Sequence, residues 1–145
     1  MIYSKSAEYA IQAMIYLTEK KPKNPVMIHE IAKEYNIPSQ YLSKIMQNLV
    51  KYGFISTTRG RNGGVMLAKS PKKIFLNEIV ASIDGPAPTK EKCVIGLDLC
   101  SDTVPCPLHD EWKPIRHQMR VMLETESFEH LTKIVTEKRE KMIEK

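Results

Sequence analysis

Hydrophobic residues recur every three or four positions through the first third of the chain, and this period predicts helices with one buried face. The first predicted helix spans Ser4 to Lys20. A charged loop with prolines follows, then a short second helix and a third that runs from about Ser39 to Tyr52. The buried stripes of the three helices are, in order, Ala10, Ile11, Met14 and Leu17; Ile28, Ile31 and Ala32; and Leu42, Ile45 and Leu49.

The chain turns between the second and third predicted helices, at Tyr35-Asn36-Ile37-Pro38. Asn36 tolerates the left-handed backbone conformation that ends a helix, and Pro38 suits the start of the next one. Ile37 lies between them and can fill the core. Two short helices joined by a tight turn of this kind indicate a helix-turn-helix.

A β-hairpin is predicted after the third helix, because two strand-like runs flank a glycine-rich turn. The runs are 54–59 and 65–69, and the turn reads Gly60-Arg61-Asn62-Gly63-Gly64. A hairpin in this position is typical of the wing of a winged helix. Its basic tip can enter the minor groove of DNA, where guanidinium groups favour the negative potential of narrow A·T-rich segments.

Two amphipathic segments end the chain. Between Asp110 and Glu124 the apolar residues fall at a heptad-like spacing, and a second segment begins at Phe128. The positions concerned are Trp112, Ile115, Met119 and Met122, then Leu131, Val135 and Met142. Such stripes are often ordinary core, but a long amphipathic helix in a short chain packs most economically against its own copy. We therefore expect a homodimer.

These patterns predict a mainly α fold with a small β-hairpin wing and three regions. Residues 1–84 form a winged helix-turn-helix DNA-binding domain, residues 85–109 a cysteine loop, and residues 110–145 the dimerisation and C-terminal helices. The 145 residues are 42% apolar, which is enough for one buried core. No leader-like or membrane-spanning apolar run is present, so we expect a cytoplasmic protein with no membrane partner.

Charge is unevenly distributed along the chain, and the asymmetry says more than the net charge of +5. Residues 1–79 hold twelve Lys or Arg against five Asp or Glu, whereas residues 80–145 hold ten against twelve. The basic first half of the chain suits binding to double-stranded DNA, because each phosphate that it neutralises releases counterions and so adds affinity. The residues expected to contact DNA are Ser39, Gln40, Tyr41, Ser43 and Lys44 of the third helix, and Arg59, Gly60, Arg61 and Asn62 of the hairpin.

All three cysteines of the chain lie in one loop with a histidine just beyond them, at Cys93, Cys100, Cys106 and His109. Thiolates and imidazole are the ligands that iron–sulfur clusters and zinc accept. Structural zinc sites usually separate paired cysteines by about two to four residues, and the gaps here are longer, which favours a cluster over zinc. The other interpretation is that the cysteines are small buried hydrophobes, although core cysteines tend to lie on helices and strands rather than in loops.

The chain resembles a family of winged-helix transcription regulators that includes IscR, NsrR, RirA and CymR. The resemblance rests on five motifs in order: Ser6 to Met14, Ile31-Ala32, Tyr41-Leu42, Arg59-Gly60 followed by Gly63-Gly64, and Ile83-Asp84-Gly85 before the cysteine loop. It implies a homodimeric DNA-binding regulator, a repressor or an activator, whose 2Fe-2S or 4Fe-4S cluster reports iron–sulfur supply, nitric oxide or redox stress. Cys93, Cys100 and Cys106 fall at the family's cysteine positions.

The resemblance leaves the fourth ligand open between His109, which matches the histidine of IscR-like members, and Glu8 of the first helix. No catalytic motif accompanies these residues, so we do not expect an enzyme. We expect a transcriptional regulator, with repression the favoured action, that is gated by the cluster. The alternative is a cluster-free winged-helix regulator that responds to thiol oxidation or to a protein partner.

Overall fold

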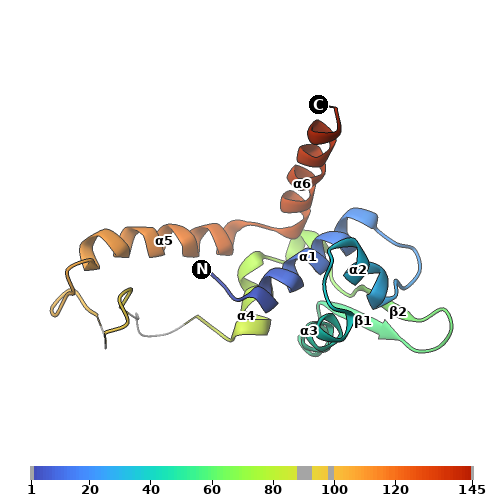
Figure 1. Cartoon of the computed structure of the whole chain (residues 1–145), viewed down its shortest axis with the longest axis horizontal. Coiled ribbons are helices and arrows are strands. Elements are labelled where there is room, and N and C mark those ends of the chain that lie inside the picture. Colours follow the sequence, from blue (N-terminus) through green and yellow to red (C-terminus); the bar gives the residue numbers. More distant parts are fainter. Residues whose placement is uncertain (1, 88–92, 98–99, 145) are drawn as a thin grey trace.

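The computed structural model describes residues 2–87, 93–97 and 100–144, and in this part of the chain helices dominate (Figure 1). The N-terminal helices are α1 (Lys5–Lys20), α2 (Ile28–Glu34) and α3 (Ser39–Lys51). A hairpin of β1 (Ile55–Thr58) and β2 (Gly64–Leu67) follows, then a short 3-10 turn η1 (Pro71–Lys73) and α4 (Leu76–Asp84). The chain ends with α5 (His109–Thr125) and α6 (Phe128–Ile143).

The predicted helix-turn-helix is confirmed, with its boundaries close to those expected. Ser4 caps α1 by accepting a hydrogen bond from the amide of Ala7 at 3.1 Å. Asn36 adopts the expected left-handed backbone with a φ of 53°. Ile37 is buried in the core between α2 and α3, as its place in the turn predicted.

The hairpin wing is also confirmed, but its second strand begins one residue earlier than the pattern indicated. Thr58 pairs with Gly64 and Ile55 with Leu67, so Gly64 belongs to the strand and not to the turn. Val65 also exchanges two backbone hydrogen bonds with Val26, from the loop before α2, with N···O distances of 3.0 and 2.8 Å. The hairpin is therefore fastened to the helical body along β2.

The core lies between α1, α3 and α4, with the start of α6 closing one side. Phe128 at the head of α6 is fully buried, and its amide donates to the carbonyl of Ile74 at 2.9 Å. In return the amide of Leu76 donates to the carbonyl of Glu126 at 3.0 Å. This pair of bonds joins the start of α4 to the junction of α5 and α6, so that both C-terminal helices leave the body at one point.

Figure 1 shows the resulting shape. α5 extends away from the winged helix, and the segment with the cysteines lies at its far end. The hairpin lies at the opposite end of the long axis, and α6 projects from the body on the side away from α3. No helix of the described residues is long and apolar enough to cross a membrane. Of the predicted cysteine loop, 85–109, residues 88–92 and 98–99 lie outside the described part, as do Met1 and Lys145 at the ends of the outer regions.

Candidate metal centre and nucleic-acid interface

The three cysteine sulfurs lie within 4.8 Å of one another. Cys93 and Cys100 are buried and Cys106 is half-buried, and all three thiols are free. None of them lies in a helix or strand, as the loop composition predicted. Cys93 and Cys100 are buried but do not belong to the hydrophobic core cluster. The loop therefore buries these two thiols by folding on itself.

Local turns bring these sulfurs together. The amide of Gly96 donates to the carbonyl of Cys93 at 3.1 Å, and Gly96 has a φ of 79° that suits glycine. A second turn spans Ser101 to Val104, whose amide donates to the Ser101 hydroxyl at 3.1 Å. The amide of Cys106 then lies 3.3 Å from the Cys100 sulfur and donates to it. An N–H directed at a sulfur stabilises negative charge on it.

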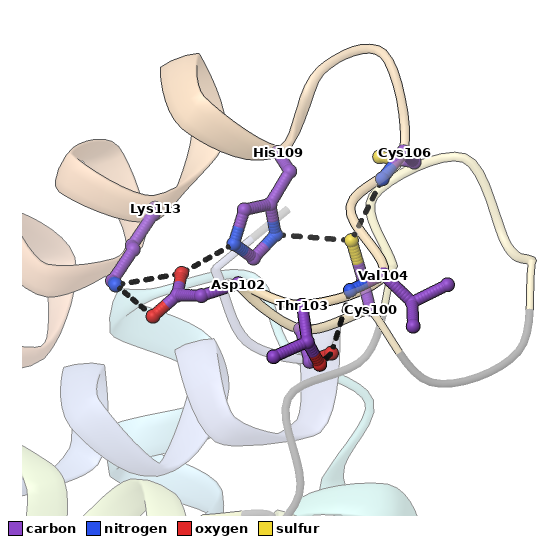
Figure 2. Close-up of polar contacts among 8 residues, drawn as sticks. Cys100, Asp102, Thr103, Val104, Cys106, His109 and Lys113 are labelled. Atoms are coloured by element: carbon purple, nitrogen blue, oxygen red, sulfur yellow. Dashed lines mark hydrogen bonds and ion pairs between the residues drawn. The ribbon is translucent and has the colours of Figure 1, made fainter.

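His109 is the first residue of α5 and is 3% exposed. Its Nδ1 lies 3.0 Å from the Cys100 sulfur, and its Nε2 lies 2.8 Å from Asp102 Oδ1 (Figure 2). Lys113, one helical turn further along α5, places its Nζ 2.9 and 2.8 Å from the two oxygens of the same carboxylate. The sequence reasoning identified His109 but missed Asp102 and Lys113.

The pKa of the Asp102 carboxyl is lowered to about 2 by the hydrogen bond from Lys113 and, next, by the one from His109. The carboxylate is therefore ionised near neutral pH and acts as an acceptor only. No pattern in the sequence reveals this contact, because Asp102 lies in the irregular turn at Ser101–Val104 and Lys113 lies on α5.

These donors fit a cluster or a soft metal ion. Three thiols and one imidazole match the ligand chemistry of both, and their mutual proximity needs no large rearrangement. Glu8, the other candidate for the fourth ligand, lies on α1 and forms an ion pair with Lys5 at 3.0 Å. The structure thus brings His109, and not Glu8, to a cysteine of the same chain.

Helix α3 presents most of the side chains predicted to contact DNA. Ser39, Gln40 and Lys44 are exposed. Ser43 is half-buried and its hydroxyl donates to the carbonyl of Ser39 at 2.9 Å. Tyr41 is 43% exposed, but its ring packs edge-on against Tyr9 and its hydroxyl contacts the Ser6 hydroxyl, so α1 holds it in place.

The hairpin turn carries the remaining predicted DNA contacts. Arg59, Gly60, Arg61 and Asn62 are all exposed at its tip. Gly63 is needed for the fold of this turn, because a Cβ there would lie 2.1 Å from the carbonyl oxygen of Thr58. α3 and the hairpin lie along the same side of the molecule, as a winged helix requires for one DNA duplex (Figure 1).

Comparison with known proteins places the chain in a family. The model of the Rrf2 family, described as iron-dependent transcriptional regulators, matches residues 3–134. The chain belongs to the Rrf2 family. It is 34% identical over 122 residues to an HTH-type transcriptional regulator of Aquifex aeolicus, with 83% of each chain covered.

Other Rrf2 relatives carry more specific names. The chain is 37% identical over 73 residues to the regulator NsrR of Bacillus licheniformis, covering 50% of this chain and 51% of that one. It is 26% identical over 133 residues to the regulator IscR of Xenorhabdus nematophila, covering 92% and 80%. The structure of CymR, the global cysteine regulator of B. subtilis, superimposes with a TM-score of 0.74 at 24% identity, over 90% of this chain and 95% of that one.

Membership of the Rrf2 family confirms the resemblance inferred from the five sequence motifs and the winged-helix fold. It also establishes that the chain is a transcriptional regulator and not an enzyme.

Proposed function

We propose that this Rrf2 regulator binds an iron–sulfur cluster through Cys93, Cys100, Cys106 and His109, and that the cluster controls its affinity for an operator. The observation that carries the proposal is the set of three sulfurs within 4.8 Å, with a buried imidazole against one of them. Relatives named NsrR and IscR support it. When bound, such a cluster supplies a centre sensitive to iron supply, oxidants and nitric oxide.

DNA binding is proposed to use both α3 and the hairpin of the winged helix. The exposed side chains of Ser39, Gln40 and Lys44 reach the major groove, while Arg59 and Arg61 enter the minor groove. Tyr41 acts differently from the other residues, because its hydroxyl is already held by Ser6. The exposed edge of Tyr41 contacts the DNA backbone, while its ring packs against Tyr9 and fixes α3 against α1.

A homodimer is proposed through α5, with action in the cytoplasm as a repressor. Ile115 and Met122, spaced one heptad apart, are 48% and 45% exposed on this helix. Apolar side chains left open along a helix that extends from the body suit packing against a second copy. Two-fold symmetry then sets the two recognition helices about 34 Å apart, one turn of DNA.

The test begins with protein purified without oxygen. We expect visible absorption, with iron and sulfide in stoichiometric amount, and an operator affinity that differs at least tenfold between cluster-loaded and cluster-free dimers. A tenfold difference corresponds to ~1.4 kcal/mol of coupling. Protein with neither iron nor sulfide after anaerobic reconstitution would rule out the cluster. Equal operator affinity of the cluster-loaded and cluster-free dimers would contradict the proposal that the cluster is the switch.

The identity of the fourth ligand is tested separately. H109A and E8A are compared for cluster loss, and we expect H109A alone to accelerate it. A second copy of the chain could bring Glu8 to the sulfurs in a dimer, so a large effect of E8A with none of H109A would transfer the role to Glu8.

A cluster-free thiol sensor is the second candidate, and one observation favours it. Free sulfurs this close to one another can join as a disulfide after a modest movement of the loop. In that case mild peroxide treatment of the iron-free protein lowers operator affinity, and a reductant restores it.

A further inference from the structure

His109 has two ring nitrogens with different partners. Nε2 faces the Asp102 carboxylate at 2.8 Å, and Nδ1 faces the Cys100 sulfur at 3.0 Å (Figure 2). The ring is buried, so solvent does not compete for either nitrogen. Each nitrogen of the His109 ring therefore faces one partner within the protein.

A carboxylate only accepts hydrogen bonds, so the nitrogen beside Asp102 must carry the hydrogen. In a neutral imidazole the lone pair then lies on the other nitrogen, Nδ1. Nδ1 is the nitrogen directed at Cys100, and a metal ligand must offer a lone pair. The carboxylate thus prepares the ring for ligation from its far side, as carboxylates behind ligating histidines do.

Asp102 is itself held in place. The turn at Ser101–Val104 directs its side chain toward the start of α5. Lys113 binds both carboxylate oxygens, at 2.9 and 2.8 Å. His109 and Lys113 are four residues apart on α5, so they share a face of the helix and meet the carboxylate together.

We propose that Asp102, held by Lys113, is a positioning residue that fixes the His109 ring with Nδ1 toward the cysteine sulfurs, making Nδ1 the ligand atom. The inference rests on the proposed cluster for its consequence, but the ring arrangement exists in the cluster-free protein and can be measured there. Asp102 acts only through His109 and does not touch the bound group.

The first experiment compares D102A with D110A in the full chain. Asp110 is an exposed carboxylate next to His109 in the first turn of α5, so D110A controls for lost charge at the helix start. Loaded proteins are mixed anaerobically with an iron chelator, and cluster absorption is followed. We expect D102A to lose the cluster about 10- to 100-fold faster than the wild type, the usual cost of removing such a partner. D110A should lose the cluster at close to the wild-type rate, because it leaves the bond between Asp102 and His109 in place.

The second experiment repeats D102A in an H109A background. A residue that acts through His109 has nothing left to position there, so the double variant should lose the cluster at the rate of H109A alone. K113M, which frees the carboxylate from the other side without touching the ring, should accelerate loss in the same direction as D102A by a smaller factor.

The third experiment needs no cluster. Nitrogen-15 NMR of the reduced, metal-free protein reports which ring nitrogen carries hydrogen, and we expect the neutral form of the His109 ring to carry its hydrogen on Nε2. A neutral His109 ring with its hydrogen on Nδ1 overturns the positioning role. The role is also overturned if D102A loses the cluster no faster than D110A, or if D102A accelerates cluster loss by the same factor with and without His109. Wild-type protein that takes up no iron and sulfide overturns the proposed function instead.

Discussion

Replacing Gly64 by alanine should detach the wing from the winged-helix body. A Cβ at this position would lie 2.3 Å from the carbonyl oxygen and 2.5 Å from the carbonyl carbon of Val26, so backbone must move. The movement breaks the two hydrogen bonds between Val26 and Val65, each with a net value of about 0.5–1.5 kcal/mol. Gly64 also has a φ of 151°, and strain at such a backbone costs about 1–3 kcal/mol. We expect the free energy of unfolding to fall by about 2–6 kcal/mol in total.

Gly60 provides the matched control. Its φ is also positive, at 105°, but a Cβ there meets no atom within 4 Å, so G60A adds strain without a collision. Urea denaturation measures both free energies, and the difference between the variants isolates the contact with Val26. Operator affinity should fall further for G64A than for G60A, while cluster loading stays unchanged, because the cysteine segment lies at the other end of the molecule (Figure 1).

Equal free energies of unfolding for G64A and G60A would refute this reasoning, because the close approach of β2 to the loop before α2 would then be absent. If G64A loses much stability but its operator affinity is unchanged, the contact between β2 and Val26 is supported and the role of the wing in DNA binding is contradicted.

Three further expectations follow from other parts of the structure. R59A should weaken operator binding by about 1–3 kcal/mol, and unchanged affinity of R59A contradicts the minor-groove contact. Lys72 is an exposed lysine of η1 that we expect to contact only phosphates, so K72A should lower only the salt slope, by about one. Each of the three cysteines replaced by alanine should abolish cluster absorption while circular dichroism stays native, and a variant with full absorption excludes that cysteine as a ligand. The Arg139 guanidinium binds Glu19 at 2.7 Å and the Tyr35 hydroxyl at 3.0 Å, and so fastens α6 to α1 and α2. R139A should lower the free energy of unfolding by about 1 kcal/mol. R139K should recover little of this loss, because lysine lacks the planar fork of donors that arginine has.

Local sequence signals were enough to predict the elements that we propose contact DNA. Helical periodicity predicted α1 and α3, and Asn36 and Ile37 predicted the turn that joins α2 to α3. The boundary error at Gly64 has a physical reason. Glycine-rich sequence indicates a turn, but this glycine is required because the strand passes close to Val26, and such an approach is a tertiary contact that no local pattern contains.

The candidate metal centre was predictable only in its ligands. Soft side chains clustered in one loop identified Cys93, Cys100, Cys106 and His109, because ligand chemistry depends on residue type. Their supports depend on how the loop folds, so Asp102 could not be separated from other acidic residues nearby. The role proposed for Asp102 rests on its contacts with Lys113 and His109, which meet it from the same face of α5.

A short series of contacts in the described residues joins the end of α4 to α3. Asp84 is the last residue of α4, and its carboxylate accepts hydrogen bonds from the Ser4 amide at 2.9 Å and from the Ser4 hydroxyl. Ser4 also caps α1, and Ser6 two residues later contacts the Tyr41 hydroxyl on α3. One such hydrogen bond contributes about 0.5–1.5 kcal/mol, and a tenfold change in operator affinity needs ~1.4 kcal/mol. Loss or gain of a single contact at Ser4 is therefore of the size that a switch between two DNA affinities requires, without any large rearrangement of the core.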